Sequence, residues 1–260
     1  MADATSENIR KRHIERQQKR IRQMKQRRII TISLLALLVI LIIILFTPLF
    51  NIRKIAVEGT ERVNPAQIEE CLEKCLGRNI FRYRTGAPVK RMKAIPYVDN
   101  VTIDKSAFSG KLTITVTESI PAAYVEVGEK KIIVDSALKV LEVTDSFEGD
   151  VPRIIDVSTM EIKPGKTLSL QSEDALNALK TVISVISREN LLSGIEYISF
   201  KDLNSIIFNY QERLDVVCGS VENFENKIKL FSQAIGTSTL TENSRGTIDL
   251  SVTGQAVYTP

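Results

Sequence analysis

The feature that most constrains this chain is an uncharged apolar run of 22 residues at positions 29–50, which reads IITISLLALLVILIIILFTPLF. Seventeen of the 22 residues are Ile, Leu, Val or Phe. A helix of that length rises roughly 33 Å, enough to cross a hydrocarbon layer of ~30 Å. A cleaved signal peptide is a weaker interpretation, because its apolar core spans about 7–15 residues and precedes a small-residue cleavage site. The sequence therefore predicts a transmembrane helix over residues 29–50.

Basic residues are concentrated on the N-terminal side of this run. Residues 1–28 contain ten Lys and Arg, whereas the first turns beyond the run contain only Arg53 and Lys54. Because basic flanks tend to remain cytoplasmic, we expect a single-pass type II protein of the cell membrane, with residues 51–260 extracytoplasmic. The basic tail is expected to lie against anionic lipid headgroups. A nucleic-acid-binding arm is the alternative, and no motif supports it.

The charge of residues 51–260, counted separately from the basic tail, indicates which partners this part can bind. Residues 51–260 contain 25 basic and 28 acidic side chains, so this part is close to neutral and is not expected to bind nucleic acid. Its length of about 210 residues fits one large or two small domains, and we favour two. The chain has no Trp and 6% aromatic residues, which disfavours a carbohydrate-binding groove.

The first half of residues 51–260 has the pattern of a small α+β domain. A strand is expected near 51–57, followed by a helix with Asn64 as its N-cap, Pro65 at its first position and Gly77 at its end. Pro88 opens a second helix, and strands follow at 97–104 and 111–118. The order is β-α-α-β-β, with two helices on one face of a small sheet.

The second half predicts a mixed, β-rich domain with two helices. Ser172 precedes the longest helix, and a second helix follows a meander of strands at 195–200, 205–210 and 213–218. The two helices carry apolar stripes at helical spacing, formed by Leu176, Leu179, Ile183 and Ile186 in the first and by Phe224, Ile228, Phe231 and Ile235 in the second. A strand is expected at 247–252, followed by a closing segment at 255–258.

The three cysteines fit a hydrophobic core better than a disulfide or a metal site. Cys71 and Cys75 fall at i and i+4 of the first expected helix, too far apart for an undistorted disulfide, and Cys218 alternates with apolar residues on a strand. The single histidine, His13, lies in the basic tail, so residues 51–260 cannot form a Ser/His/Asp or Cys/His site. We therefore predict no catalytic residues, no metal site and no cofactor.

Several segments together resemble a known family. They are IAVEG at 55–59, GRNIF at 77–81, PYVDNV at 96–101, LTITVTE at 112–118 and PAAYV at 121–125. They are similar to the POTRA domain of the FtsQ/DivIB bacterial cell-division proteins. The resemblance implies a cytoplasmic tail at 1–28, a span at 29–50, a POTRA domain at 51–121 and an FtsQ-type β domain at 122–260. One departure is FSG at 108–110, where family members often have an Arg and a Pro.

The resemblance also implies a function. It predicts a divisome scaffold, enriched at the division septum, that binds FtsL-like and FtsB/DivIC-like single-span proteins and helps recruit or regulate septal wall synthases. Membrane lipid would be contacted through the span and the basic tail. A membrane-anchored chaperone or export component is the alternative, because POTRA domains also receive unfolded strands during outer-membrane assembly.

The resemblance places the partner site near the C-terminus. Few residues follow the strand expected at 247–252, so we expect it at a sheet edge, where a partner segment could add as an extra strand. The predicted partner-binding residues are Thr247, Ile248, Asp249, Leu250, Ser251 and Val252. Ser251 and Val252 replace the family's Arg and Tyr, so contact is expected to rest on backbone pairing, Ile248 and Leu250. The alternative is an ordinary core strand, with the partner surface elsewhere.

Overall fold

The computed structural model describes residues 24–25, 27–72, 74–158, 162–236, 240, 243–252 and 254–260. The predicted basic tail at 1–28 therefore lies almost entirely outside the described residues, and His13 lies outside them too. By their internal contacts the residues form two compact units. The first contains Met1–Ala56, Lys74–Arg84 and Asp104–Thr113, and the second contains Val57–Glu73, Thr85–Ile103 and Ile114–Pro260.

The N-terminal apolar run forms a helix, as predicted, but this helix is shorter than the run. Arg27–Leu45 is long and apolar enough to cross a membrane, with a mean hydropathy of 3.0 and no buried residues. Pro48–Phe50 forms a separate 3₁₀ turn, η1. The predicted helix over 29–50 is therefore wrong in its last five residues, and Pro48 explains the break because it cannot donate a hydrogen bond within a helix. At 19 residues the helix is about 28 Å long.

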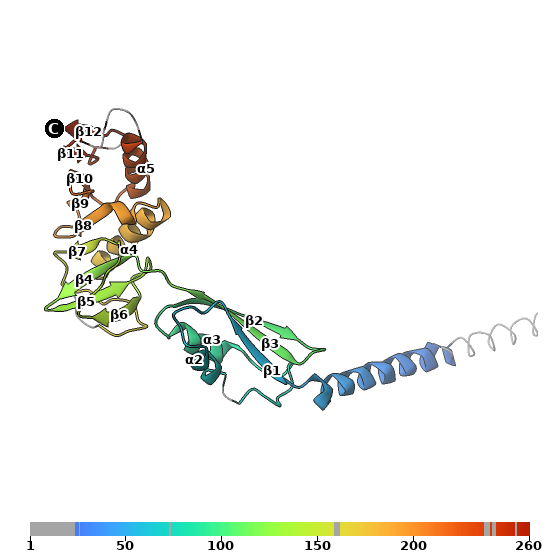
Figure 1. The fold of residues 1–260 in the computed structure, drawn as a ribbon. Coiled ribbons are helices and arrows are strands. Elements are labelled where there is room, and N and C mark those ends of the chain that lie inside the picture. The colour runs from blue at the N-terminus through green and yellow to red at the C-terminus, as the bar shows by residue number, and fades with distance from the viewer. Residues whose placement is uncertain are drawn as a thin grey trace, which may run out of the picture. The chain divides into compact units, whose positions relative to one another are not determined.

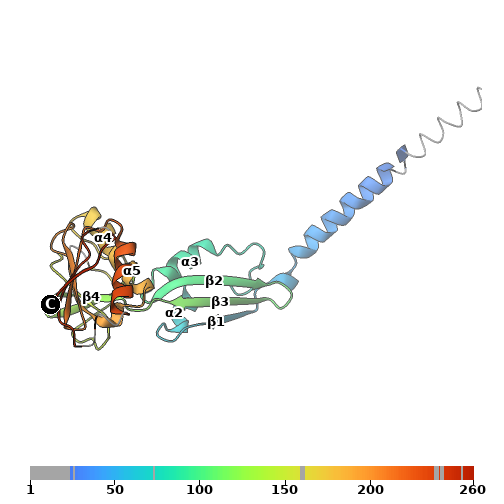
Figure 2. The same cartoon turned by 90° about the horizontal axis from the view of Figure 1, so that it is seen from above.

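The β-α-α-β-β order predicted after this helix is confirmed. Its strands are β1 (Lys54–Glu58), β2 (Val98–Ser106) and β3 (Lys111–Glu118), in the spatial order β1-β3-β2 (Figure 2). Helices α2 (Pro65–Glu70) and α3 (Gly86–Lys93) lie on one side of this sheet (Figure 1). The alternation read in β3 is also confirmed, since Leu112, Ile114 and Val116 are buried.

The first of these helices begins as predicted and ends early. The Asn64 side chain accepts a hydrogen bond from the Ala66 N–H, and Pro65 is the first helical residue. The helix ends at Glu70 rather than near Gly77. Cys71 is its C-cap and half buried, while Cys75 lies beyond it and is buried, so their predicted i, i+4 placement on one helix is wrong. All three cysteines are free thiols.

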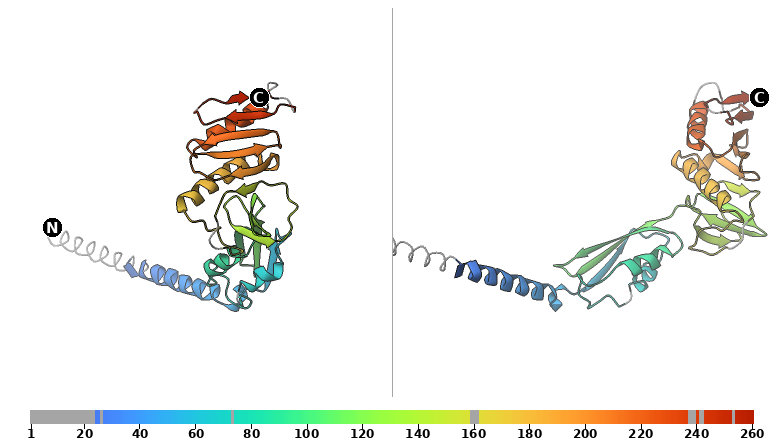
Figure 3. Two further views of the ribbon diagram at one scale, coloured as in Figure 1. Left: turned by 90° about the vertical axis from the view of Figure 1, so that its left-hand side faces the viewer. Right: turned by 180° about the vertical axis from the view of Figure 1, so that it is seen from behind.

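A nine-stranded sheet dominates the rest of the chain. Its order is β12-β11-β10-β9-β8-β7-β4-β5-β6, so the meander of β8, β9 and β10 predicted from the sequence is confirmed (Figures 1 and 3). The strands are β4 (Ala123–Val127), β5 (Lys130–Val134), β6 (Val140–Thr144), β7 (Arg153–Ile155), β8 (Ile195–Ser199), β9 (Ile206–Tyr210), β10 (Leu214–Gly219), β11 (Gly246–Asp249) and β12 (Val257–Thr259).

Two amphipathic helices cover one side of this sheet (Figure 1). They are α4 (Glu173–Arg188), capped by the Ser172 side chain as predicted, and α5 (Phe224–Ile235); a short 3₁₀ turn, η2 (Leu192–Gly194), follows α4. Leu179, Ile183 and Ile186 of α4 are buried, as are Phe224, Ile228 and Phe231 of α5. Phe231 stands edge-on to Phe208 of β9, with 5.2 Å between ring centroids, so the predicted apolar stripes do form the core.

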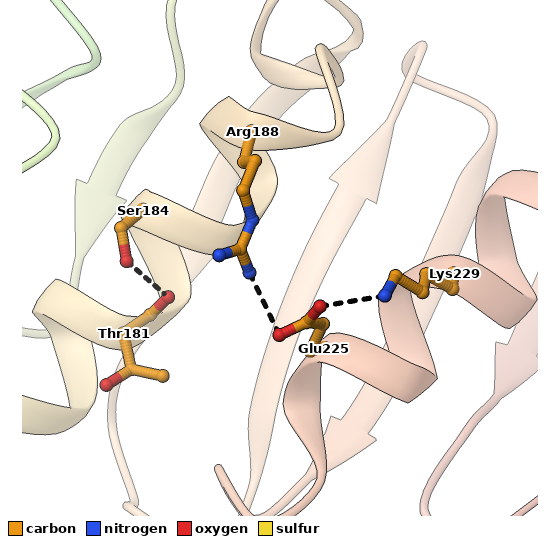
Figure 4. A network of polar contacts seen from close by, with 5 residues as sticks. All are labelled: Thr181, Ser184, Arg188, Glu225 and Lys229. Atoms are coloured by element: carbon orange, nitrogen blue, oxygen red, sulfur yellow. Dashed lines mark hydrogen bonds and ion pairs between the residues drawn. The ribbon is translucent and has the colours of Figure 1, made fainter.

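A polar bridge joins the two helices on their exposed side (Figure 4). Glu225 of α5 accepts from Arg188 of α4 at 3.0 Å and from Lys229, one turn further along α5, at 2.7 Å. All three side chains are largely exposed, so this bridge adds little to the free energy of folding. The buried stripes, rather than the ion pairs, hold α4 and α5 against the sheet.

Candidate partner-docking edge

The strand predicted to be a sheet edge is not one. Within the predicted 247–252 segment, β11 ends at Asp249 and has a neighbour on both sides. It runs parallel to β10, with Ile248 opposite Val216, and antiparallel to β12, with Ile248 opposite Tyr258. The expectation of an edge failed because the chain turns back after Leu250 and adds the three-residue strand β12. Three residues are too few to produce a recognisable hydrophobic period.

The six predicted partner-binding residues occupy three different environments. Ile248 and Leu250 are 1% and 0% exposed and belong to the core beneath the helices. Thr247 and Asp249 are half buried, whereas Ser251 and Val252 are exposed. The expectation that a partner would contact Ile248 and Leu250 is therefore wrong, because neither side chain reaches the surface. Ser251 and Val252 remain accessible to a partner.

The backbone of Ser251 is occupied by a local turn. Its N–H donates to Asp249 Oδ1 at 2.8 Å. Hydrogen bonds from the Ser251 hydroxyl and from this N–H lower the pKa of Asp249 below its usual value. Ser251 therefore does not present an N–H to a partner strand. Together with Gly254, whose φ of +80° suits a glycine, this turn reverses the chain between β11 and β12.

Two backbone hydrogen bonds to β10 show which residues of β11 face that strand. Gly246 N–H donates to Arg213 O at 3.1 Å, and Leu250 N–H donates to Val217 O at 2.8 Å. Backbone groups alternate in direction along a strand, so Ile248, between these two, also faces β10. The intervening residues of β11, Thr247 and Asp249, therefore direct their backbone groups toward β12.

The same alternation identifies the open groups of β12. Thr247 and Asp249 lie opposite Thr259 and Val257, so these are the hydrogen-bonded pairs of the ladder. Tyr258, between Val257 and Thr259, consequently directs its N–H and C=O away from β11. All three residues of β12 are exposed, and no strand follows β12 in the sheet as far as the chain is described. The edge predicted at β11 is thus displaced by one strand.

Side chains behind the edge hold it in place. The Tyr258 hydroxyl donates to Arg245 O at 2.7 Å, which ties β12 to the residue that precedes β11. Arg213, just before β10, donates to Ser244 O at 3.0 Å. On the helix side, the buried ammonium of Lys227 donates to Cys218 O at 2.8 Å and to Ser220 O at 2.9 Å. These bonds attach the edge to its neighbours on both sides of β11.

The opposite edge of the same sheet is partly covered, at the start of β6. At β6, the Val140 N–H donates to Lys166 O and the Gly165 N–H donates to Val140 O, each at 2.8 Å. An isolated bridge between Lys139 and Thr167 extends this cover. The loop around 165–167 thus occupies the backbone groups of Val140, at the start of β6, that could otherwise pair with another chain. Among the described residues, no comparable loop pairs with the outward backbone groups of β12.

The described residues offer little else for chemistry. Among them, no three His, Cys, Asp or Glu side chains are grouped so that they could hold a metal ion. Burial raises the pKa of the Cys218 thiol to about 12, and the nearby Lys227 ammonium offsets this only in part. Cys218 is therefore a core side chain rather than a nucleophile. The arrangement can bind an extended segment through its backbone.

Comparisons with known proteins agree with this architecture. Residues 50–119 match the family model of the FtsQ-type POTRA domain. The chain is similar to the cell division protein FtsQ of Corynebacterium glutamicum, with 24% identity over 192 residues that cover 73% of this chain and 81% of that protein. It is similar to the cell division protein DivIB of Clostridium acetobutylicum, with 28% identity over 215 residues that cover 81% and 83%.

Among solved structures, the chain resembles the major extracytoplasmic domain of the trans isomer of DivIB from Geobacillus stearothermophilus. The identity is 15%, the match covers 48% of this chain and 99% of that domain, and the TM-score is 0.32. At that score the likeness adds no argument about geometry. The POTRA match and the two relatives fit the observed order of apolar helix, small α+β domain and β-rich domain. The chain thus contains an FtsQ-type POTRA domain at residues 50–119 and is similar to the bacterial cell division proteins FtsQ and DivIB.

Proposed function

We propose that this protein is a bitopic scaffold of the bacterial divisome. It binds other single-span division proteins of the FtsL and FtsB/DivIC type and thereby helps recruit or regulate septal wall synthases. The names of its two relatives support a role in cell division. The observation that carries the proposal is the open edge at β12, where Tyr258 directs its backbone N–H and C=O away from the sheet.

The proposed mechanism is strand addition. An extended segment of the partner pairs with β12, and its backbone groups bond to those of Tyr258. Val257 and Tyr258 are 50% and 37% exposed, so their side chains can select the partner's residues. Such an interaction uses no catalytic group, and we propose that the protein acts by association rather than as an enzyme.

The predicted residues at 247–252 keep a role in this proposal, but not the same role for each. Thr247 and Asp249 pair with β12 and hold it in register. Ile248 and Leu250 anchor β11 in the core, so they support the edge from behind. Ser251 and Val252 are exposed next to the edge and are the two members of the set that a docked segment can touch.

We further propose that the N-terminus is cytoplasmic and that residues 51–260 lie outside, at the division septum. The support is the asymmetry of ten basic residues in 1–28 against Arg53 and Lys54 just beyond the span. In this orientation the β12 edge faces the compartment in which the septal wall is made. Anchoring by the span also keeps the protein in the same membrane as other anchored proteins, which raises their effective concentration and favours pairing.

Co-purification of the full chain with its division partners tests the proposal. Tyr258→Pro removes the outward N–H at a position where an edge strand tolerates proline, so it should abolish recovery of the partner. Tyr258→Phe is the matched control: it loses only the hydroxyl bond to Arg245 and should retain the partner. Normal partner recovery by a folded Tyr258→Pro variant would contradict strand addition. Recovery of diverse export clients instead of division proteins would contradict the scaffold itself.

A further inference from the structure

Three segments that are distant in sequence meet where the apolar helix ends, at residues 46–54, 76–84 and 106–111. Backbone bonds join them: Ile80 N–H donates to Phe50 O at 2.8 Å, Gly77 N–H to Ile52 O at 2.8 Å, and Arg53 N–H to Gly110 O at 2.7 Å. All three segments belong to the first compact unit, together with the helix. We call this cluster the foot.

The foot exposes large apolar side chains that a water-soluble surface would bury. Each segment contributes at least one: Leu49 is 63% exposed, Leu76 56%, Phe81 52% and Phe108 96%. Two of the rings gather around Phe50, whose ring centroid lies 5.5 Å from that of Phe81 and 6.4 Å from that of Phe108. Phe50, Phe81 and Phe108 therefore form one aromatic patch rather than scattered single contacts, and Leu49 and Leu76 add exposed apolar surface in the same segments.

The helix end beside this patch is capped by side chains. Asn79 Nδ2 donates to Leu45 O at 3.0 Å, and Thr47 Oγ1 donates to Ile44 O at 2.6 Å. An Arg53 guanidinium nitrogen donates to Leu49 O at 3.2 Å. The last carbonyls of a helix need such partners most where water is scarce. These caps are what a helix ending within the membrane interface requires.

Charge is distributed unevenly between the foot and the rest of the exterior part. The foot has six basic residues and no acidic one, whereas the other residues of 51–260 include 19 basic and 28 acidic side chains. The basic residues are Arg53, Lys54, Arg78, Arg82, Arg84 and Lys111. The Arg82 guanidinium also lies 6.0 Å from the ring centroid of Phe46, the first residue after the helix. Cations thus surround an apolar patch.

We propose that the foot is a membrane-interface anchor that inserts Phe81 and Phe108 among the acyl chains and places its arginines against anionic lipid headgroups. The helix Arg27–Leu45 rises about 28 Å, close to the thickness of the hydrocarbon layer, so the apolar residues 46–50 that follow it fall at the outer boundary of this layer. The patch is continuous with this span, so the surface that the patch contacts is the bilayer. Apolar insertion combined with cationic contact is the usual physics of interfacial binding.

This anchor is independent of the proposed partner docking and requires only that the helix spans a membrane. Its consequence is mechanical: the bonds among the three segments fix the first residues after the span to the lipid surface. A span without the foot would leave the exterior part on a flexible connection, whereas the foot fixes this connection at the lipid surface. The height at which the protein holds its β1-β3-β2 sheet is then set by the foot.

The absence of native Trp allows a direct test in the full chain, with one copy per lipid nanodisc. Phe108→Trp should give blue-shifted emission that is quenched by lipids brominated near the headgroup. Ile120→Trp is the control, because Ile120 is 80% exposed and follows the other end of β3. We expect quenching several-fold stronger at position 108 than at position 120. Equal quenching at the two positions, with circular dichroism showing folded variants, would overturn the anchor.

The contact between the basic residues of the foot and anionic headgroups is tested separately, by adding Arg78→Glu and Arg84→Glu to the Phe108→Trp chain. Replacing part of the phosphatidylcholine with phosphatidylglycerol should deepen the quenching of the parent, and the charge reversal should remove that gain. Lys180→Glu with Lys201→Glu, a reversal of two exposed lysines elsewhere, should leave the gain intact. An unchanged gain after reversal at Arg78 and Arg84 would refute the headgroup contact. Shielding of position 108 only on addition of a partner protein would assign the patch to a protein and contradict the proposal.

Discussion

Glu118, the last residue of β3, shows how one side chain can fix a loop. Its Oε1 accepts from the N–H groups of Glu61, Arg62 and Val63 at 2.9, 3.0 and 2.9 Å. Partial desolvation raises the pKa of this carboxyl, but these backbone hydrogen bonds outweigh it and hold the pKa below its usual value of 4.5. The charged form of Glu118 therefore stabilises the turn before α2.

We expect Glu118→Gln to lower the free energy of unfolding by about 1 kcal/mol at pH 7, a small value for charge-assisted hydrogen bonds because the carboxylate is partly exposed. Since the folded-state pKa is depressed, the stabilisation is fully present above pH 4.5 and is lost as the pH falls through the folded-state pKa. The gap between parent and variant should therefore close in acid.

Urea midpoints of the full chain in detergent, measured between pH 7 and pH 3, check this expectation. Glu129→Gln, which changes an exposed carboxylate in the β4–β5 turn, is the control and should leave the midpoint unchanged. A gap between parent and Glu118→Gln that persists or widens in acid would show that the charge of Glu118 is not what stabilises the loop.

At the scale of elements, helix caps and hydrophobic periodicity could be predicted from the sequence, whereas the pairing of segments distant in the sequence could not. Asn64 was predicted as an N-cap and Ser172 was predicted to open the longest helix, and both cap their helices. For β3, which has a clear alternation, the predicted bounds match the observed ones to the residue. These signals are local, because a cap or an alternating run depends on a few neighbouring residues. They held wherever tertiary contacts did not compete with them.

Long-range contacts contribute to each failure. The first helix after the span stops at Glu70 and not at Gly77, since the backbone of 77–80 pairs with 50–52 instead. The helix over the apolar run stops at Leu45 because a local breaker, Pro48, and a distant cap, Asn79, both act at its end. Most important for the site, β12 rather than β11 forms the sheet edge. A strand of three residues has too short a pattern for its pairing to be predicted from the sequence.

For the whole molecule, the order of apolar helix, β-α-α-β-β domain and β-rich domain was predictable because each part has its own residue pattern. The foot was not predicted, because it joins residues 46–50, which were assigned to the span, to two segments that are distant in the sequence. Phe108 belongs to FSG at 108–110, a departure from the family pattern that became interpretable only beside Phe50 and Phe81. Residue type alone did not reveal that these rings gather at the end of the span.

Orientation is a prediction at this same scale. With Cys71 replaced by Ser to remove a half-buried thiol, an impermeant thiol reagent should label Gln255→Cys and spare Thr5→Cys in intact cells whose outer barrier is permeabilised. Both positions should react after lysis, which controls for accessibility. Labelling of position 5 but not of position 255 before lysis would reverse the topology and remove the β12 edge from the septal compartment.

Amide hydrogen exchange tests most directly whether a division partner adds a strand to β12. The full chain in nanodiscs would be compared with and without a co-purified FtsB- or DivIC-type partner. We expect slower exchange of the outward Tyr258 amide on partner binding, while the buried amides of β10 keep the rates they had. Unchanged exchange over Val257–Thr259, with new protection elsewhere in the chain, would contradict it.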